Sequence, residues 1–136
     1  MRSRRSRLLL AGDKTYRWTL SHRHEVTGEA SYRDCREILT VRSEGSRTQL
    51  RIVFADGPNR LVAGTYLHSG GVLRLDDNAY LNLHRPGVVR TLIDLALTGG
   101  ADVGRTTELD GWQLFDQALR DRGERTGVRD EPGGRG

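Results

Sequence analysis

The sequence predicts an α+β fold: an antiparallel β-meander of about five or six strands with two C-terminal helices, at least one of them packed on one sheet face. Three observations predict it. Apolar and polar residues alternate with a period of two in several segments before residue 85, turn residues separate these segments, and apolar residues recur at helical spacing after residue 85. Strands followed by helices are typical of the α+β class.

The first strand is the clearest. Tyr16, Trp18 and Leu20 alternate with Thr15, Arg17 and Thr19, which is the pattern of a half-buried strand over 14–20, and His22, His24 and Val26 continue it. Residues 27–37 show no clear period. Further strands are predicted at 38–41, 50–54, 60–68, 72–76 and 80–84. Turns are predicted between them, around 44–46, 56–59, 69–71 and 77–79.

Two helices complete the predicted core. Pro86 suits the first position of a helix over 86–98 and Gly99 suits its end; the apolar face comprises Val89, Leu92, Ile93 and Ala96. A second helix over 108–122 is predicted from the apolar stripe of Trp112, Phe115 and Leu119. Thr107 and Asp110 resemble a capping box at its start.

The chain of 136 residues fits one domain, over 8–122, between a basic disordered arm at 1–7 and a disordered tail at 123–136. Its single cysteine, Cys35, excludes an internal disulfide. Because no apolar stretch is long enough to span a membrane or to form a signal peptide, we expect a small soluble cytoplasmic protein. Lys14 is the only lysine, and this preference for Arg is typical of a GC-rich bacterial genome.

The net charge of +4 is concentrated at the ends of the chain. Residues 1–7 carry four basic side chains and no acid, whereas residues 8–119 carry 13 basic and 14 acidic side chains, a net charge of −1. Since phosphate neutralisation drives non-specific affinity for nucleic acids, we expect such affinity to be weak and to reside in the arm, at Arg2, Arg4, Arg5 and Arg7.

No convincing catalytic or metal site is evident, and no cofactor is predicted. Residues 99–106 approach a phosphate-loop pattern, but Arg105 replaces its lysine and the segment follows a helix, where a phosphate loop follows a strand. His22 and His24 could place two imidazoles on one side of a strand, but a third metal ligand is missing from the pattern. We therefore predict a non-catalytic protein-binding module, such as a small adaptor, regulator or immunity-type protein. The alternatives are a nucleic-acid-binding protein that uses the arm and an enzyme or small-ligand binder of unknown class.

The predicted partner surface follows from residue parity in the later strands. The apolar residues of these strands are odd-numbered, so they should share the buried face; they are Leu61, Ala63, Leu67, Leu73, Leu75, Leu81 and Leu83. This arrangement places Leu67 opposite Leu73 and Leu75 opposite Leu81, and both connections are then three-residue loops. The other face then carries side chains that are enriched at binding hot spots, and the predicted partner-binding residues are Tyr66, Arg74, Tyr80, Asn82 and His84.

Overall fold

The computed structural model describes residues 6–11, 13–28, 31–62, 70–101 and 105–126, and these form strands and helices in the order that the α+β prediction requires. The prediction of the fold class is confirmed. The elements are β1 (Arg7–Ala11), β2 (Lys14–Gly28), β3 (Ser31–Ser43), β4 (Leu50–Ala55), β5 (Arg60–Val62), β6 (Gly71–Arg74), β7 (Ala79–Asn82), α1 (Pro86–Thr98), β8 (Thr107–Asp110) and α2 (Trp112–Thr126).

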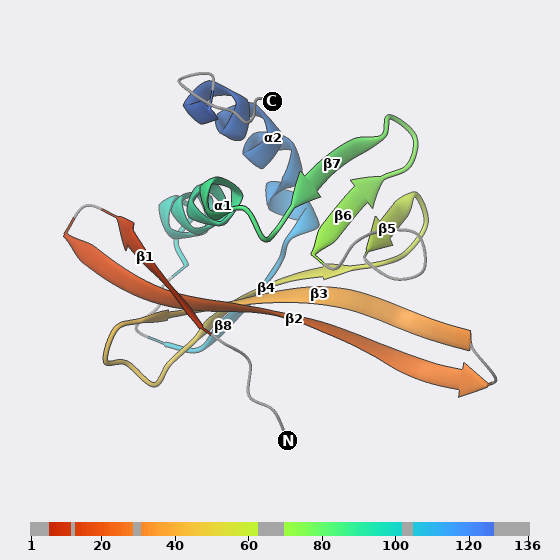
Figure 1. The fold of residues 1–136 in the computed structure, drawn as a ribbon, viewed down its shortest axis with the longest axis horizontal. Helices are drawn as coiled ribbons and strands as arrows, with labels where there is room; N and C mark the ends of the chain where they lie inside the picture. The colour runs from red at the N-terminus through yellow and green to blue at the C-terminus, as the bar shows by residue number, and fades with distance from the viewer. Residues whose placement is uncertain (1–5, 12, 29–30, 63–69, 102–104, 127–136) are drawn as a thin grey trace.

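The strands form two sheets. The larger sheet has the order β1-β2-β3-β4-β8, in which β1 to β4 are antiparallel neighbours, and the smaller sheet has the order β5-β6-β7. The smaller sheet and both helices lie on one side of the larger sheet (Figure 1). The larger sheet therefore has a covered face and an open face.

Alternation along the strands explains the covered face. Trp18 of β2, Leu39 and Val41 of β3, and Ile52 and Phe54 of β4 are buried in one core. The residues between them point to the open face, since successive side chains of a strand point to opposite faces. Burial of these large apolar side chains is the main stabilising contribution to the fold.

The hairpin of β2 and β3 is longer than predicted. The two strands stay paired from Tyr16–Ser43 to Gly28–Ser31, with register shifts after Arg23 and after Val26. Residues 27–37 thus include the ends of both strands, and the hairpin projects beyond the other elements (Figure 1). The register shifts interrupt the alternation of faces along the strands, and this is why the segment shows no clear period.

Helix α1 matches its predicted bounds and buried face. Val89, Leu92, Ile93 and Ala96 are buried, Pro86 lies in the first turn, and the backbone N–H of Gly99 donates to the carbonyl of Leu95 at 3.0 Å. The connection after α1 leads into strand β8, and residues 102–104 of this connection lie outside the described residues.

Strand β8 corrects the prediction for Thr107–Asp110, which were expected to start the second helix. β8 pairs in parallel with β4: the amide of Thr107 donates to the carbonyl of Gln49 at 2.9 Å, and that of Gly111 donates to the carbonyl of Val53 at 2.7 Å. These bonds satisfy an edge of β4 that would otherwise be unpaired.

Helix α2 consequently begins at Trp112, not at 108, and it ends at Thr126, four residues into the predicted tail. Its cap is Asp110, whose carboxylate accepts a hydrogen bond from the Trp112 amide at 3.0 Å, and not Thr107. The rest of the predicted tail, from residue 127, lies outside the described residues.

The smaller sheet corrects the predicted register. Val72 pairs with Leu81, and Leu73 pairs with Leu61 on one side and with Tyr80 on the other. Val62, Val72, Leu81 and Leu83 are buried, whereas Leu73 is half-buried and Leu75 is 48% exposed. Of the residues predicted to face the core, only Leu81 and Leu83 do so fully, while Ala63 and Leu67 lie outside the described residues.

The reason is the length of one turn. Arg74 pairs with Ala79, so four residues connect β6 to β7, where three were predicted. A change of one residue in a hairpin loop reverses which side chains of the next strand face the core. The left-handed conformation expected of this turn is present at Asn78, whose φ is 57°.

Candidate functional site

The open face of the larger sheet carries a concentration of arginine. Arg17 of β2 lies directly opposite Arg42 of β3, and Arg23 of β2 lies directly opposite Arg36 of β3. Arg51 of β4 pairs with Thr40, in the row next to the first Arg pair. Between the two Arg pairs the strands carry Thr19, Ser21 and Thr40, which have short side chains, and Ile38, which is buried. We call this row of residues, with a pair of arginines at each end, the arginine trough.

Few carboxylates neutralise this face. Glu44 accepts a hydrogen bond from Arg17 Nε at 2.9 Å, and Glu108 lies 3.7 Å from Arg51 Nη1. Among the side chains that the structure describes, which leave out those of residues 24–34, no carboxylate forms an ion pair with Arg23, Arg36 or Arg42. Like charges directly opposite on neighbouring strands destabilise a sheet. The arrangement is therefore unfavourable for folding.

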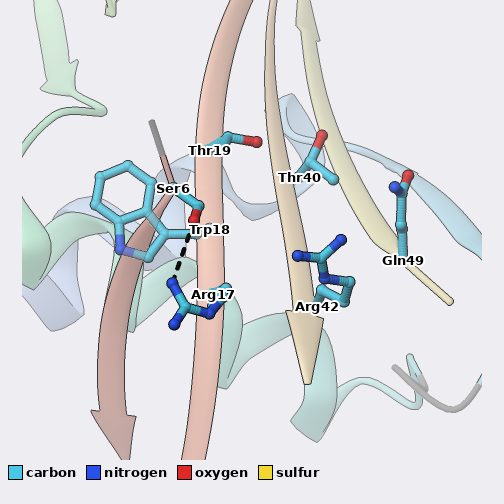
Figure 2. A pocket seen from close by; sticks show the side chains of 7 residues that line it. All are labelled: Ser6, Arg17, Trp18, Thr19, Thr40, Arg42 and Gln49. Atoms are coloured by element: carbon cyan, nitrogen blue, oxygen red, sulfur yellow. Dashed lines mark hydrogen bonds between the residues drawn. The ribbon is translucent and has the colours of Figure 1, made fainter. Parts of the chain in front are cut away.

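A pocket of about 80 Å³ lies at the Arg17–Arg42 end of the trough. Figure 2 shows that Arg17 and Thr19 reach it from β2, and Thr40 and Arg42 from β3. Its lining comprises Ser6, Arg17, Trp18, Thr19, Thr40, Arg42 and Gln49. No carboxylate contributes to this lining, and its two guanidinium groups are hydrogen-bond donors only.

The predicted partner surface is divided by the observed register. Arg74 pairs with Ala79, and both lie on the side of the smaller sheet that faces α2. Tyr80 and Asn82 alternate with Ala79 and Leu81 along β7, so they lie on the other side of the sheet. Tyr80 is 36% exposed. His84 follows β7 and is exposed, and Tyr66 lies outside the described residues. The five residues therefore do not form the single face that was predicted, and their role in partner binding stays a prediction.

Arg74 connects the smaller sheet to α2. Its guanidinium bonds to Asp77 Oδ2 at 2.8 Å and to Asp116 Oδ1, and it stacks over the Phe115 ring at 5.1 Å. Hydrogen bonds to Asp77 and then to Asp116 raise the pKa of Arg74, while the hydrogen bond from Arg74 is the main cause that lowers the pKa of Asp77 to about 2. These contacts indicate a structural role for Arg74.

A second polar cluster lies between the two sheets. Glu37, on the covered face of β3, is fully buried, and its Oε2 lies 2.7 Å from His22 Nδ1. Its Oε1 has no hydrogen-bond partner among the described residues. Burial is the largest cause of a raised pKa of Glu37, and it outweighs the opposing effects of His22, the Gly70 backbone and His84. His22 thus has a carboxylate partner at its Nδ1 atom.

Gly70 allows His84 to approach this cluster. A Cβ atom at Gly70 would lie 2.5 Å from His84 Cδ2, and the φ of Gly70 is +88°, a conformation that favours glycine. Of the side chains that the structure describes, no three or more His, Cys, Asp or Glu residues are grouped so that they could hold a metal ion; the side chain of His24 is outside this set. The cluster is therefore best understood as a polar contact that joins the two sheets.

The predicted basic arm is described only at its end. Arg7 begins β1, and its guanidinium stacks over the Trp18 ring at 5.3 Å from the ring centroid, which is a cation–π contact. Arg2, Arg4 and Arg5 lie outside the described residues. Arg7 thus has a packing role at the edge of the larger sheet.

Comparison with known proteins does not identify a relative. No family model, no curated protein and no solved structure matches the chain. Neither described helix has the length and apolar character needed to cross a lipid bilayer. The function is consequently inferred from the geometry of the chain itself.

The sequence interpretation overlooked the arginine trough, although part of the signal was present. Alternation in 14–20 and 50–54 already placed Arg17 and Arg51 opposite the apolar face. What it could not show is that Arg42 lies beside Arg17, and Arg36 beside Arg23, because the register of β2 with β3 brings together residues that are up to 25 positions apart.

Proposed function

We propose that the protein binds nucleic acid through the open face of its larger sheet. The observation that carries this proposal is the pair of cross-strand arginine contacts, Arg17 with Arg42 and Arg23 with Arg36. A bound polyanion would convert the repulsion within each pair into attraction to a shared phosphate, because each guanidinium offers several donors in a planar fork.

The spacing of the trough suits a repeating anion. Neighbouring strands lie about 4.8 Å apart, so the two guanidinium groups of a pair can reach one phosphate. Six residues separate Arg17 from Arg23, which corresponds to about 20 Å along the strand, or roughly six nucleotide steps of a duplex strand. A nucleic-acid backbone therefore offers phosphates that both ends of the trough could reach, whereas an acidic protein would need carboxylates placed to match.

The composition of the trough supports contact with the backbone and not with bases. Its floor offers hydroxyl groups at Thr19, Ser21 and Thr40, and the residues that form the trough itself are not aromatic. Base stacking normally requires such aromatics. We therefore infer binding with little sequence preference and strong dependence on salt. This function is compatible with a cytoplasmic protein.

The test is a titration of fluorescein-labelled duplex DNA, duplex RNA and single-stranded RNA, monitored by anisotropy at about 50 and 200 mM salt. Replacing Arg17 and Arg42 together by Gln should weaken binding at least about tenfold, since a charge-assisted hydrogen bond contributes about 1.5–3 kcal/mol. The slope of log affinity against log salt should fall by about two.

The matched control replaces Arg85 and Arg120 by Gln. This variant removes the same charge from the segment before α1 and from α2, which lie away from the open face. It should retain most of the affinity. Equal losses in the two variants would show that only net charge matters, and absence of binding by the full chain to all three probes would overturn the proposal.

Protein binding is the second candidate function, and the smaller sheet favours it. Leu75 and Tyr80 are exposed there, and large exposed apolar residues are common in protein interfaces. Affinity capture with the full chain and with a Leu75→Ser, Tyr80→Ala variant, followed by identification of the captured proteins, tests this candidate. Capture of the same proteins by both folded chains would exclude this surface.

A further inference from the structure

The pocket at one end of the trough differs from the rest of the open face. Its lining combines two guanidinium groups, three hydroxyl groups and the amide of Gln49 in a volume of about 80 Å³. A water molecule needs about 10–15 Å³ of such space, so the pocket can hold a compact group of several heavy atoms. Figure 2 shows these side chains spread across the paired strands, with Arg17 and Thr19 on β2, Thr40 and Arg42 on β3, and Gln49 beyond β3.

We propose that this pocket binds a terminal phosphate, that is, a phosphate monoester, in preference to an internal phosphodiester. The inference rests on the proposed nucleic-acid function and specifies the ligand of one end of the same site. A monoester carries a charge of about −1.5 to −2 at pH 7 and presents three terminal oxygens. A phosphodiester carries a single charge and two such oxygens, so it would leave part of the donor set unsatisfied.

The contacts already made in the pocket use two N–H groups of Arg17 and leave the other donors available. Glu44 occupies Arg17 Nε at 2.9 Å, and the Ser6 hydroxyl accepts a bond from Arg17 Nη1 at 3.3 Å. A hydroxyl that accepts one hydrogen bond can still donate its own proton to a ligand. Arg42 has no carboxylate partner among the described residues, so its whole fork can face the anion.

Geometry also limits how an internal phosphate could enter. Thr19 and Thr40 form directly opposed short side chains beside the longer Arg17 and Arg42. Gln49 precedes Leu50, which pairs with Val41, so it lies next to Arg42 just past the end of the β3–β4 pairing. A chain end can place its phosphate between these groups with one bond leading out, whereas an internal phosphate must let the backbone leave in two directions.

The experiment uses the full chain and a short single-stranded oligonucleotide in three forms: with a 5′-phosphate, with a 3′-phosphate, and with hydroxyls at both ends. The label lies at the end that is not varied. We expect one phosphorylated form to bind about tenfold more tightly than the hydroxyl form, which corresponds to about 1.4 kcal/mol. Titration of inorganic phosphate and of a 5′-mononucleotide into ¹⁵N-labelled protein, followed by NMR, measures the pocket without the oligonucleotide.

Two variants separate the pocket from the trough. Arg42→Gln should abolish the preference for a phosphorylated end, whereas Arg36→Gln, which removes the same charge from the same strand at the other Arg pair, should lower affinity for all forms and keep the preference. Equal affinity for the three forms, with binding intact, would overturn the pocket proposal alone. Binding of phosphate or the mononucleotide at the pocket without binding of any oligonucleotide would support the pocket and overturn the nucleic-acid function.

Discussion

On the covered face of the larger sheet Leu39, Val41 and Ile52 are completely buried, while on the open face of the same strands Thr40, Arg42 and Arg51 remain in contact with solvent. The covered face obtains its stability from apolar packing with the helices and the smaller sheet. The open face places positive charges opposite one another, which costs stability. This difference teaches that a net charge of −1 over residues 8–119 can conceal a strongly segregated surface.

The largest difference between the faces should appear in stability. Phe54→Ala removes a fully buried ring that packs edge-to-face on Trp112 at 5.4 Å, and it should lower the free energy of unfolding by about 3–5 kcal/mol. Val53→Ala, on the open face of the same strand, should cost less than about 1 kcal/mol. Urea unfolding monitored by circular dichroism measures both. Similar costs would show that the open face is covered in solution.

Glu37 is the exception on the covered face, and pH should reveal it. Its raised pKa means that the folded state binds the proton more tightly than the unfolded state does. The stability that this proton contributes is therefore fully present below the unfolded pKa, near 4.5, and is lost as pH rises through the folded pKa.

Comparison with Glu37→Gln isolates this contribution. The unfolding free energy of the wild-type chain should fall relative to that of the variant as pH rises from about 4 toward 7, with a slope of at most about 1.4 kcal/mol per pH unit. Urea titrations of both chains at several pH values measure the slope. Parallel curves would show that Glu37 keeps an ordinary pKa.

On the open face, the comparison predicts that a substitution that raises stability lowers nucleic-acid affinity. Arg36→Glu replaces a like-charge pair with an attractive one beside Arg23, so the free energy of unfolding should rise by about 0.5 kcal/mol at low salt. Nucleic-acid affinity should fall at the same time. A variant that loses stability and keeps its affinity would contradict the binding role of the trough.

The smallest expected effect concerns Asp77 in the turn of the smaller sheet. NMR titration of its carboxyl carbon should give a pKa of about 2, below the ordinary value of 3.8, because Arg74 donates hydrogen bonds to it. In an Arg74→Gln variant this pKa should return toward 3.8. Since the folded pKa is lowered, the stabilising effect of the pair is present above 3.8 and is lost as pH falls through about 2. An unchanged pKa in the variant would contradict this cause.

Much of the fold could be predicted because it depends on local patterns. The bounds and buried face of α1 follow from Pro86, Gly99 and helical spacing, and the first strand follows from strict alternation. Helix α2 was predicted from Trp112 and Phe115, although its start was placed too early. The strand β8 was missed because its four residues acquire their conformation by pairing with β4, and nothing local distinguishes them from a helix start.

By itself, then, the sequence determined which segments can be strands or helices and which face of each is apolar, since these depend on spacing along the chain. Only the tertiary structure decided the length of the turn between β6 and β7, and with it the side of the sheet on which Arg74 lies. It also decided the register that places Arg42 beside Arg17 and joins His22 to Glu37. Register between distant strands depends on the sum of many packing and hydrogen-bond contributions, and no short stretch of sequence contains that sum.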